Sequence, residues 1–404
     1  MNNFKRIGIA IAGVVLQIAL GSVYAWSVFR VPLAKQFHWT NTQVTLTFTI
    51  AIMALGFASF FGGLWLKKVG PRVVAITGGF LYGAGVFLAS FSGHGLWWLY
   101  ISYGVIGGIG LGFSYIIPIS VLVKWFPDKR GLMTGIAVGG FGIGALITAP
   151  VATRLIQSVG VLHTFAYLGI AYMIAAVAAA YFMQNPPDGW VPAGWDKGAI
   201  QKAQKTTADF TLKQSLKTWQ WWGLWLLLFL NTTAGISIIS QEAPMFQEFA
   251  KVNAIVAAGM VGIVSIGNAL GRVFWAWTSD FLGRKGTFAT MFIVQILLFW
   301  LLPNFHTTTS ITVLVFLILM CYGGGLGTMP AFAADYFGSA NVGSIYGLIL
   351  TAWGFASAFG PLLIANLRQS SGSFAGGLHI IAILMAVSVI LPLLLKKPSA
   401  PATH

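Results

Sequence analysis

Apolar residues run along this chain in stretches of about 20 residues, with short polar segments between them. A helix of about 20 residues spans the roughly 30 Å hydrocarbon core of a bilayer. The pattern therefore predicts an all-α membrane protein with twelve transmembrane helices. We expect them near residues 7–29, 43–66, 73–92, 97–122, 132–154, 161–183, 219–242, 254–278, 287–303, 310–332, 342–366 and 374–395.

One long polar segment interrupts the series after the sixth stretch. It covers residues 184–218 and holds five lysines and three aspartates. We predict an N-terminal six-helix bundle (1–183), a cytoplasmic linker (184–218) and a C-terminal six-helix bundle with a short tail (219–404). Two halves of this kind are typical of transporters built from repeats, whose substrate binds near the membrane midplane between the halves.

Composition and charge support this assignment. Hydrophobic residues make up 57% of the chain and charged residues 8%, which excludes an ordinary soluble domain. A net charge of +15 would indicate nucleic acid in a soluble protein, but most of the 23 Lys and Arg fall in one set of alternate loops. By the positive-inside rule both termini are cytoplasmic, and the partner is the lipid bilayer of the cell membrane. Five basic residues fall on the opposite side: Arg30, Lys35, Arg154, Lys251 and Arg368.

Arg272 is the basic residue left inside the bilayer, in the apolar stretch SIGNALGRVFWAW. A charge at this depth costs at least about 2.5–3.5 kcal/mol on insertion scales, so it marks a functional site by default. The expected partner is an anionic substrate. The alternative is that its side chain bends toward the cytoplasmic interface or bonds backbone carbonyls.

The acidic residues bear on which anion fits. All lie in loops or at the ends of expected helices, so we expect no buried carboxyl to carry a proton. One arginine matches a monoanion, whereas a dianion would leave uncompensated charge in a low dielectric. The eight acids are Asp128, Asp188, Asp196, Asp209, Glu242, Glu248, Asp280 and Asp335.

Other chemistry finds little support. No His has a second ligand at metal spacing, and Cys321 is the single cysteine. We find no nucleophile–base pair and no phosphate-binding loop. We therefore expect neither an enzyme nor a metal or cofactor site. Glycines spaced by four, among them Gly323 and Gly327, predict close approach of helices within the bilayer.

Two loops carry a further signature. GGLWLKKVGPR (62–72) and WAWTSDFLGRK (275–285) resemble the loop motif of the major facilitator superfamily, an acid followed by glycine and basic residues. The second copy keeps Asp280 and Arg284, whereas the first has Lys67 in place of the acid. The resemblance implies gating roles for Asp280 and Arg284, and for Asp128 and Arg130 in the loop between the fourth and fifth helices.

That loop, KWFPDKRGLMTG (124–135), is the most specific motif. Together with GSVYAWSVF (21–29) and the Arg272 segment, it resembles the oxalate:formate antiporter and bacterial monocarboxylate transporter group of the superfamily. The resemblance covers essentially all expected helices. It implies a twelve-helix carrier of small carboxylates that works by alternating access.

The resemblance also implies roles for individual residues. Arg272 matches the arginine that binds the substrate carboxylate, and Asn268 stands where animal monocarboxylate transporters carry a proton-linked aspartate. Trp353 replaces the lysine that engages the second carboxylate of oxalate, which favours a monoanion. Ordinary packing is the alternative for the aromatic members, and a helix–helix hydrogen bond for Asn268. The aromatic candidates are Tyr24, Tyr115, Tyr322, Trp353, Phe355 and Phe359.

The sequence therefore predicts a transporter of lactate-like or pyruvate-like monocarboxylates, with proton symport as the expected coupling. Two alternatives stay open. One is exchange of oxalate for formate. The other is a membrane sensor that does not transport, with the central linker as its output element.

Overall fold

The computed structural model describes residues 3–126, 130–187, 209–338 and 341–399. Within these ranges the protein is helical and has no β-strand, as predicted. The helices of the first half, in chain order, are α1 (Asn3–Gly21), η1 (Ser22–Ala25), α2 (Trp26–Phe37), α3 (Asn41–Val69), α4 (Pro71–Leu88), η2 (Ala89–His94), α5 (Leu96–Leu99), η3 (Tyr100–Gly107), α6 (Gly108–Trp125) and α7 (Arg130–Ala180).

The second half follows the same plan after the short helix α9 (Leu212–Leu216). Its helices are α10 (Trp219–Ile239), α11 (Glu242–Ala250), α12 (Ala254–Leu301), η4 (Leu302–Asn304), α13 (Thr308–Phe337), α14 (Val342–Ile349), α15 (Thr351–Ser371), α16 (Ala375–Ser388) and α17 (Ile390–Leu394).

Ten helices among the described residues are long and apolar enough to cross a membrane. The two longest contain a glycine with non-helical dihedrals, Gly160 in α7 and Gly283 in α12. Both glycines have positive φ, at 83° and 75°, a conformation that favours glycine because it has no Cβ. Each break lies where the sequence predicts a boundary between two spans.

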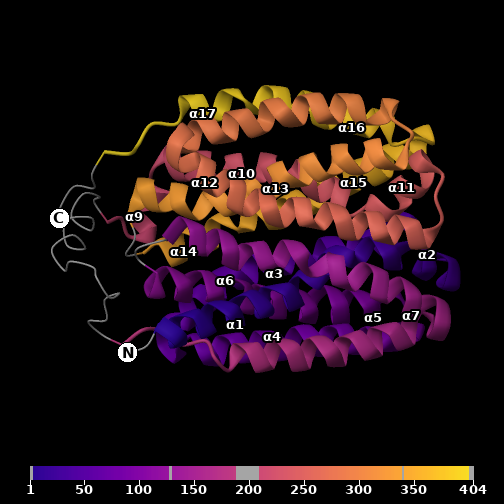
Figure 1. Cartoon of the computed structure of the whole chain (residues 1–404), viewed down its shortest axis with the longest axis horizontal. Coiled ribbons are helices and arrows are strands. Elements are labelled where there is room, and N and C mark those ends of the chain that lie inside the picture. Colours follow the sequence, from indigo (N-terminus) through magenta and orange to yellow (C-terminus); the bar gives the residue numbers. More distant parts are fainter. Residues whose placement is uncertain (1–2, 127–129, 188–208, 339–340, 400–404) are drawn as a thin grey trace.

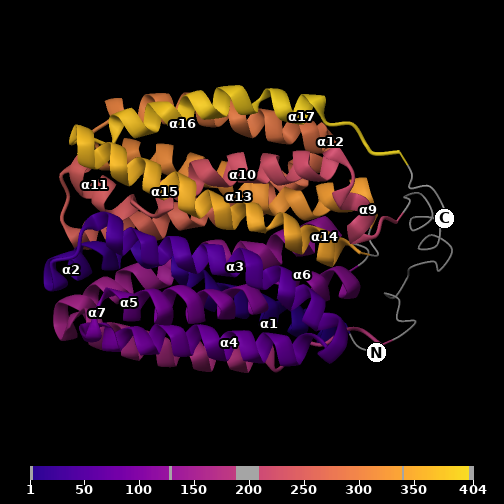
Figure 2. The same ribbon diagram turned by 180° about the vertical axis from the view of Figure 1, so that it is seen from behind.

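The helices run side by side along the long axis of the molecule (Figure 1). The first half forms one side of the bundle and the second half the other, and the view from behind agrees (Figure 2). The start of α1 and the end of α17 lie at one end of the bundle, which we call the end of the termini, with α2 and α11 at the opposite end. The two halves therefore meet along a seam that runs the length of the bundle.

Two helix pairs form most of this seam: α7 packs against α12, and α3 packs against α15. Within the second half, α12 packs most extensively against α13. A Cβ at Gly323 or Gly327 of α13 would collide with the backbone carbonyls of Asn268 and Arg272, respectively. The predicted close approach of helices is thus realised where α13 crosses the candidate site.

Two helices are irregular beside the seam. A 3₁₀ turn, η1, joins α1 to α2 in mid-span and carries Tyr24. In the second half, Leu350 separates α14 from α15, and Trp353 lies one turn later. Irregular turns within a long helix often mark functional hinges.

Candidate functional site

Arg272 lies at the centre of the seam on α12, and its side chain is 0% exposed. Its Nε donates to Oδ1 of Asn268 at 3.1 Å. Nη1 donates to the hydroxyl of Tyr115 at 3.4 Å, and Nη2 to the hydroxyl of Tyr24 at 3.2 Å. Tyr24 and Tyr115 belong to the first half, so the guanidinium links the two halves.

Aromatic rings enclose this guanidinium. The Tyr24 hydroxyl is 2.7 Å from that of Tyr322, which comes from α13. The Trp353 ring packs against Tyr115 and Tyr24, with centroids 5.5 and 6.4 Å apart. Of the residues predicted to bind substrate, the structure therefore brings together Arg272, Asn268, Tyr24, Tyr115, Tyr322 and Trp353.

No acidic side chain in the described part of the chain is paired with Arg272, whether by an ion pair or by a hydrogen bond. A guanidinium has five N–H donors, and the hydrogen bonds to Asn268, Tyr24 and Tyr115 use three of them. Two donors remain, enough for the bidentate contact that guanidinium groups make with carboxylates. The alternative in which Arg272 bends to the interface does not match its full burial.

Sequence reasoning missed two members of the cluster. Phe141 on α7 lies under the guanidinium, whose Cζ is 5.5 Å from the ring centroid. The buried Tyr346 hydroxyl on α14 lies close to Tyr115 and within electrostatic range of Arg272. Both residues stand in apolar stretches without a distinguishing motif, so only the packing of their helices reveals them.

Phe355 and Phe359, which the sequence also predicted at the substrate site, do not join this cluster. They are 44% and 50% exposed. With Trp225 and Phe229 they line an apolar groove of about 630 Å³ on the outside of the bundle. One turn of helix separates them from each other, but they point away from the Trp353 face of α15.

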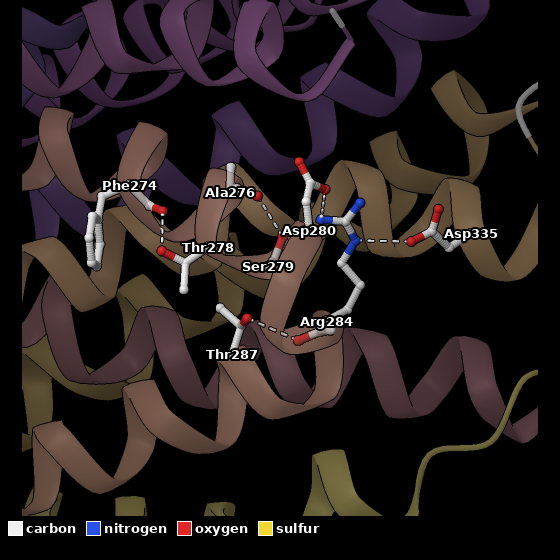
Figure 3. Close-up of polar contacts among 9 residues, drawn as sticks. Phe274, Ala276, Thr278, Ser279, Asp280, Arg284, Thr287 and Asp335 are labelled. Atoms are coloured by element: carbon white, nitrogen blue, oxygen red, sulfur yellow. Dashed lines mark hydrogen bonds and ion pairs between the residues drawn. The ribbon is translucent and has the colours of Figure 1, made fainter.

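The predicted gating residues Asp280 and Arg284 lie together at the break in α12 (Figure 3). Arg284 Nη1 is 2.8 Å from Asp280 Oδ1, and Nε is 2.9 Å from Oδ2 of Asp335 on α13. Nη1 also donates to the hydroxyl of Ser279. The sequence did not identify Asp335 as part of this cluster. Its ion pair with Arg284 links the turn at Gly283 to the end of α13.

The matching loop of the first half keeps the turn and its basic residues but not the acid. Gly70, between α3 and α4, has φ 81°, close to the 75° of Gly283. Lys67 is exposed, and the Arg72 guanidinium lies 4.7 Å from the ring centroid of Tyr181. Asp128 lies outside the described residues, as does the side chain of Arg130.

Glu242 contradicts the expectation that no carboxyl is buried. It begins α11, a helix end as predicted, but it is 2% exposed and its Oε1 has no hydrogen-bond partner. Desolvation raises the pKa of this carboxyl well above its usual range. Sequence position alone gave no sign of this, because the residue is buried by packing of α11 against α2, α12 and α13.

A family profile described as the Major Facilitator Superfamily matches residues 9–361 and 256–404. The chain belongs to this superfamily. It is therefore a multi-pass membrane transporter.

Individual relatives cover most of the chain. An uncharacterised transporter of the superfamily, YhjX of Escherichia coli, is 29% identical over 352 residues, 86% of this chain and 84% of its own. The oxalate:formate antiporter of Oxalobacter formigenes is 27% identical over 355 residues, 87% and 82% respectively. Monocarboxylate transporter 13 of Rattus norvegicus is 24% identical over 399 residues, 93% and 85% respectively.

Proposed function

We propose that this superfamily member carries small monocarboxylates of the lactate and pyruvate type across the cell membrane by alternating access. The observation that carries the proposal is the buried charge of Arg272, which has two unused N–H donors and no acidic partner among the described residues. The relatives named for carboxylates support the substrate class.

The neutral surroundings of Arg272 favour a monoanion. The groups nearest to it are the Asn268 amide, tyrosine hydroxyls and the rings of Phe141 and Trp353. A monocarboxylate would pair with the single guanidinium, and the rings would enclose its apolar end. A dianion would bring one negative charge too many into a site that excludes water.

The proposed topology has twelve spans with both termini in the cytoplasm. The ten long helices become twelve when α7 and α12 are each divided at the non-helical glycine. The helix α2, which carries Arg30 and Lys35, lies at the end of the bundle that this topology assigns to the outer face. In this arrangement the residues from 184 to 218 would link the two halves on the cytoplasmic side.

We propose proton symport as the coupling. The buried Glu242 is a candidate proton carrier that the sequence analysis did not offer. Its raised pKa means that it holds a proton at a pH where an exposed glutamate has lost it.

Uptake into proteoliposomes tests the function and its alternatives. Labelled lactate, pyruvate and oxalate are offered to the purified protein with and without an inward proton gradient. Saturable lactate or pyruvate uptake stimulated by the gradient is expected. Uptake of oxalate only against internal formate would favour the antiporter, and no uptake of any of them would favour a sensor.

Trp353 tests the choice between a monoanion and a dianion. Trp353→Lys should weaken lactate uptake and let oxalate compete, because it adds a second cation beside Tyr115 and Tyr24. Trp353→Leu controls for the volume that the indole leaves. If the lysine and leucine variants show the same competition by oxalate, charge at this position does not select the substrate.

A further inference from the structure

A second buried arginine lies beside a cavity at the end of the bundle opposite the termini. Arg30 of α2 is 2% exposed, and its Nε is buried without a hydrogen-bond partner. No ion pair to its side chain is found in the described part of the chain. Like Arg272, it is a buried charge without an ion-paired carboxylate among the described residues, although Glu248 lies within electrostatic range.

The cavity beside it, which we call the vestibule, has a volume of about 320 Å³. Both halves of the protein contribute to it, and its lining contains no acid. The lining residues are Arg30, Ala34, Trp39, Thr40, Asn41, Gln241, Ala365, Arg368 and Gln369. Thr40, Asn41 and Gln369 are exposed, whereas Arg30 and Gln241 are buried, so the polar groups extend from the surface inward.

Both arginines in the lining lie near Glu248, but only Arg368 is ion-paired with it, and Arg30 is attracted to it from a greater distance. Arg368 donates from Nε and Nη2 to Oε2 of Glu248, at 2.9 and 2.7 Å. Since Glu248 neutralises Arg368, Arg30 leaves one positive charge in the vestibule. Positive charge in a cleft with low-dielectric walls raises the local concentration of anions.

The vestibule and the Arg272 cluster are connected through α2, which begins directly after η1. Arg30 follows Tyr24 by six residues, roughly 9 Å along a helix. Between them the halves are joined by hydrogen bonds: Gln241 Nε2 donates to the Thr45 hydroxyl at 3.5 Å, and Thr49 and Ser357 exchange bonds at 2.8 and 3.1 Å. Along α15, Ser357 lies between Trp353 of the buried cluster and Ala365 of the vestibule lining.

We propose that the vestibule is a second carboxylate-binding site, in which Arg30 holds the anion before the contacts at Thr45 and Thr49 open toward Arg272. The proposal rests on the proposed function for the identity of the anion. In this proposal Arg30 captures the carboxylate from the membrane face opposite the termini. Release of the carboxylate to the other face does not involve Arg30.

Transport kinetics from each face test this role. Arg30→Gln should raise the KM for uptake from the vestibule face about fivefold or more, the effect of losing one charge-assisted contact, with Vmax within about twofold. Arg30→Lys keeps the positive charge, so its KM should stay close to that of the wild type. Intact cells and inverted vesicles expose opposite faces, which protease access to a C-terminal tag identifies. From the opposite face, Arg30→Gln should have the KM of the wild type.

Lys35→Gln is the matched control, because Lys35 is an exposed cation on the same helix that does not line the vestibule. Equal kinetics of Arg30→Gln and Lys35→Gln would overturn the proposal, since any surface charge would then serve. So would a wild-type KM in Arg30→Gln. Thermal unfolding in detergent excludes variants that are misfolded.

Binding without transport gives an independent test. Saturation-transfer NMR with lactate should detect binding to Arg272→Ala protein, and adding Arg30→Gln should abolish it. Equal concentrations of chloride and phosphate show whether the site takes any anion or prefers the carboxylate. No lactate signal from Arg272→Ala refutes the vestibule site even if the wild type transports lactate. If the wild type transports no monocarboxylate, the proposed function itself fails.

Discussion

Arg272 and Arg284 lie twelve residues apart on α12 and have opposite surroundings. Arg272 is fully buried among neutral groups and has no acid within reach in the described residues. Arg284 is partly exposed and pairs with both Asp280 and Asp335. A buried cation is stable only with a partner, so the first points to a ligand. The second already has its partners and joins two helices.

Removing Arg272 should have the largest effect. Arg272→Ala is expected to abolish saturable carboxylate uptake while the protein stays folded and membrane-inserted, because the variant loses an uncompensated buried charge. Arg272→Lys should also lose at least about tenfold in uptake, since a point ammonium does not reproduce the planar fork. If the alanine variant takes up carboxylate at the wild-type rate, Arg272 does not bind the substrate and does not differ from Arg284 in this respect.

The second-largest effect is expected from a substitution that places an acid beside Arg272, as Asp280 and Asp335 lie beside Arg284. Asn268→Asp places a carboxylate where the amide now accepts from Arg272 Nε at 3.1 Å. The ionised aspartate would compete with substrate, and protonation would release the guanidinium. Uptake should fall about tenfold as pH rises through the aspartate pKa, a steeper dependence than in the wild type. An unchanged pH profile with uptake intact would show that position 268 does not influence the bound charge.

Removing the ion pairs of Arg284 should reduce transport less than the two substitutions above. Arg284→Ala removes the link between the α12 turn and α13, and partly exposed ion pairs contribute about 0.5–1 kcal/mol. We expect Vmax to fall two- to fivefold, the change that corresponds to about that energy, while KM stays unchanged. The double variant Asp280→Asn and Asp335→Asn should behave similarly. A larger change in KM than in Vmax would place Arg284 in substrate binding instead of gating.

Glu242, the proposed proton carrier, also affects stability, and there we expect the smallest change. Its folded-state pKa is raised above the unfolded value of about 4.3, so both states are protonated below that pH. As pH rises further, only the unfolded state loses its proton at first, and folding loses stability. Glu242→Gln should therefore be stabilised relative to the wild type, by on the order of 1 kcal/mol at pH 7.5 and by much less near pH 4.5. Thermal melts at both pH values measure the difference, and an equal gain at each would show that proton release is not its cause.

Much of the architecture follows from the sequence because transmembrane helices are a local property of the chain. Runs of about 20 apolar residues fold as helices in a bilayer, where each backbone polar group needs an internal partner. The glycines that break α7 and α12 lie at predicted boundaries for the same reason. Arg272 was recognisable because a cation in an apolar run stands out whatever the fold.

Tertiary packing decided what surrounds each of these groups. Phe355 and Phe359 share a helix with Trp353, yet they face the outer groove, because the rotation of α15 against α3 and α10 is set by long-range contacts. Glu242 and Arg30 stand beside polar segments in the sequence, but packing of α11 and α2 buries them. Hydropathy along the chain identifies which segments enter the bilayer. Which side chains meet at the seam depends on how the two halves dock, and residues as distant in sequence as Tyr24 and Tyr322 determine that.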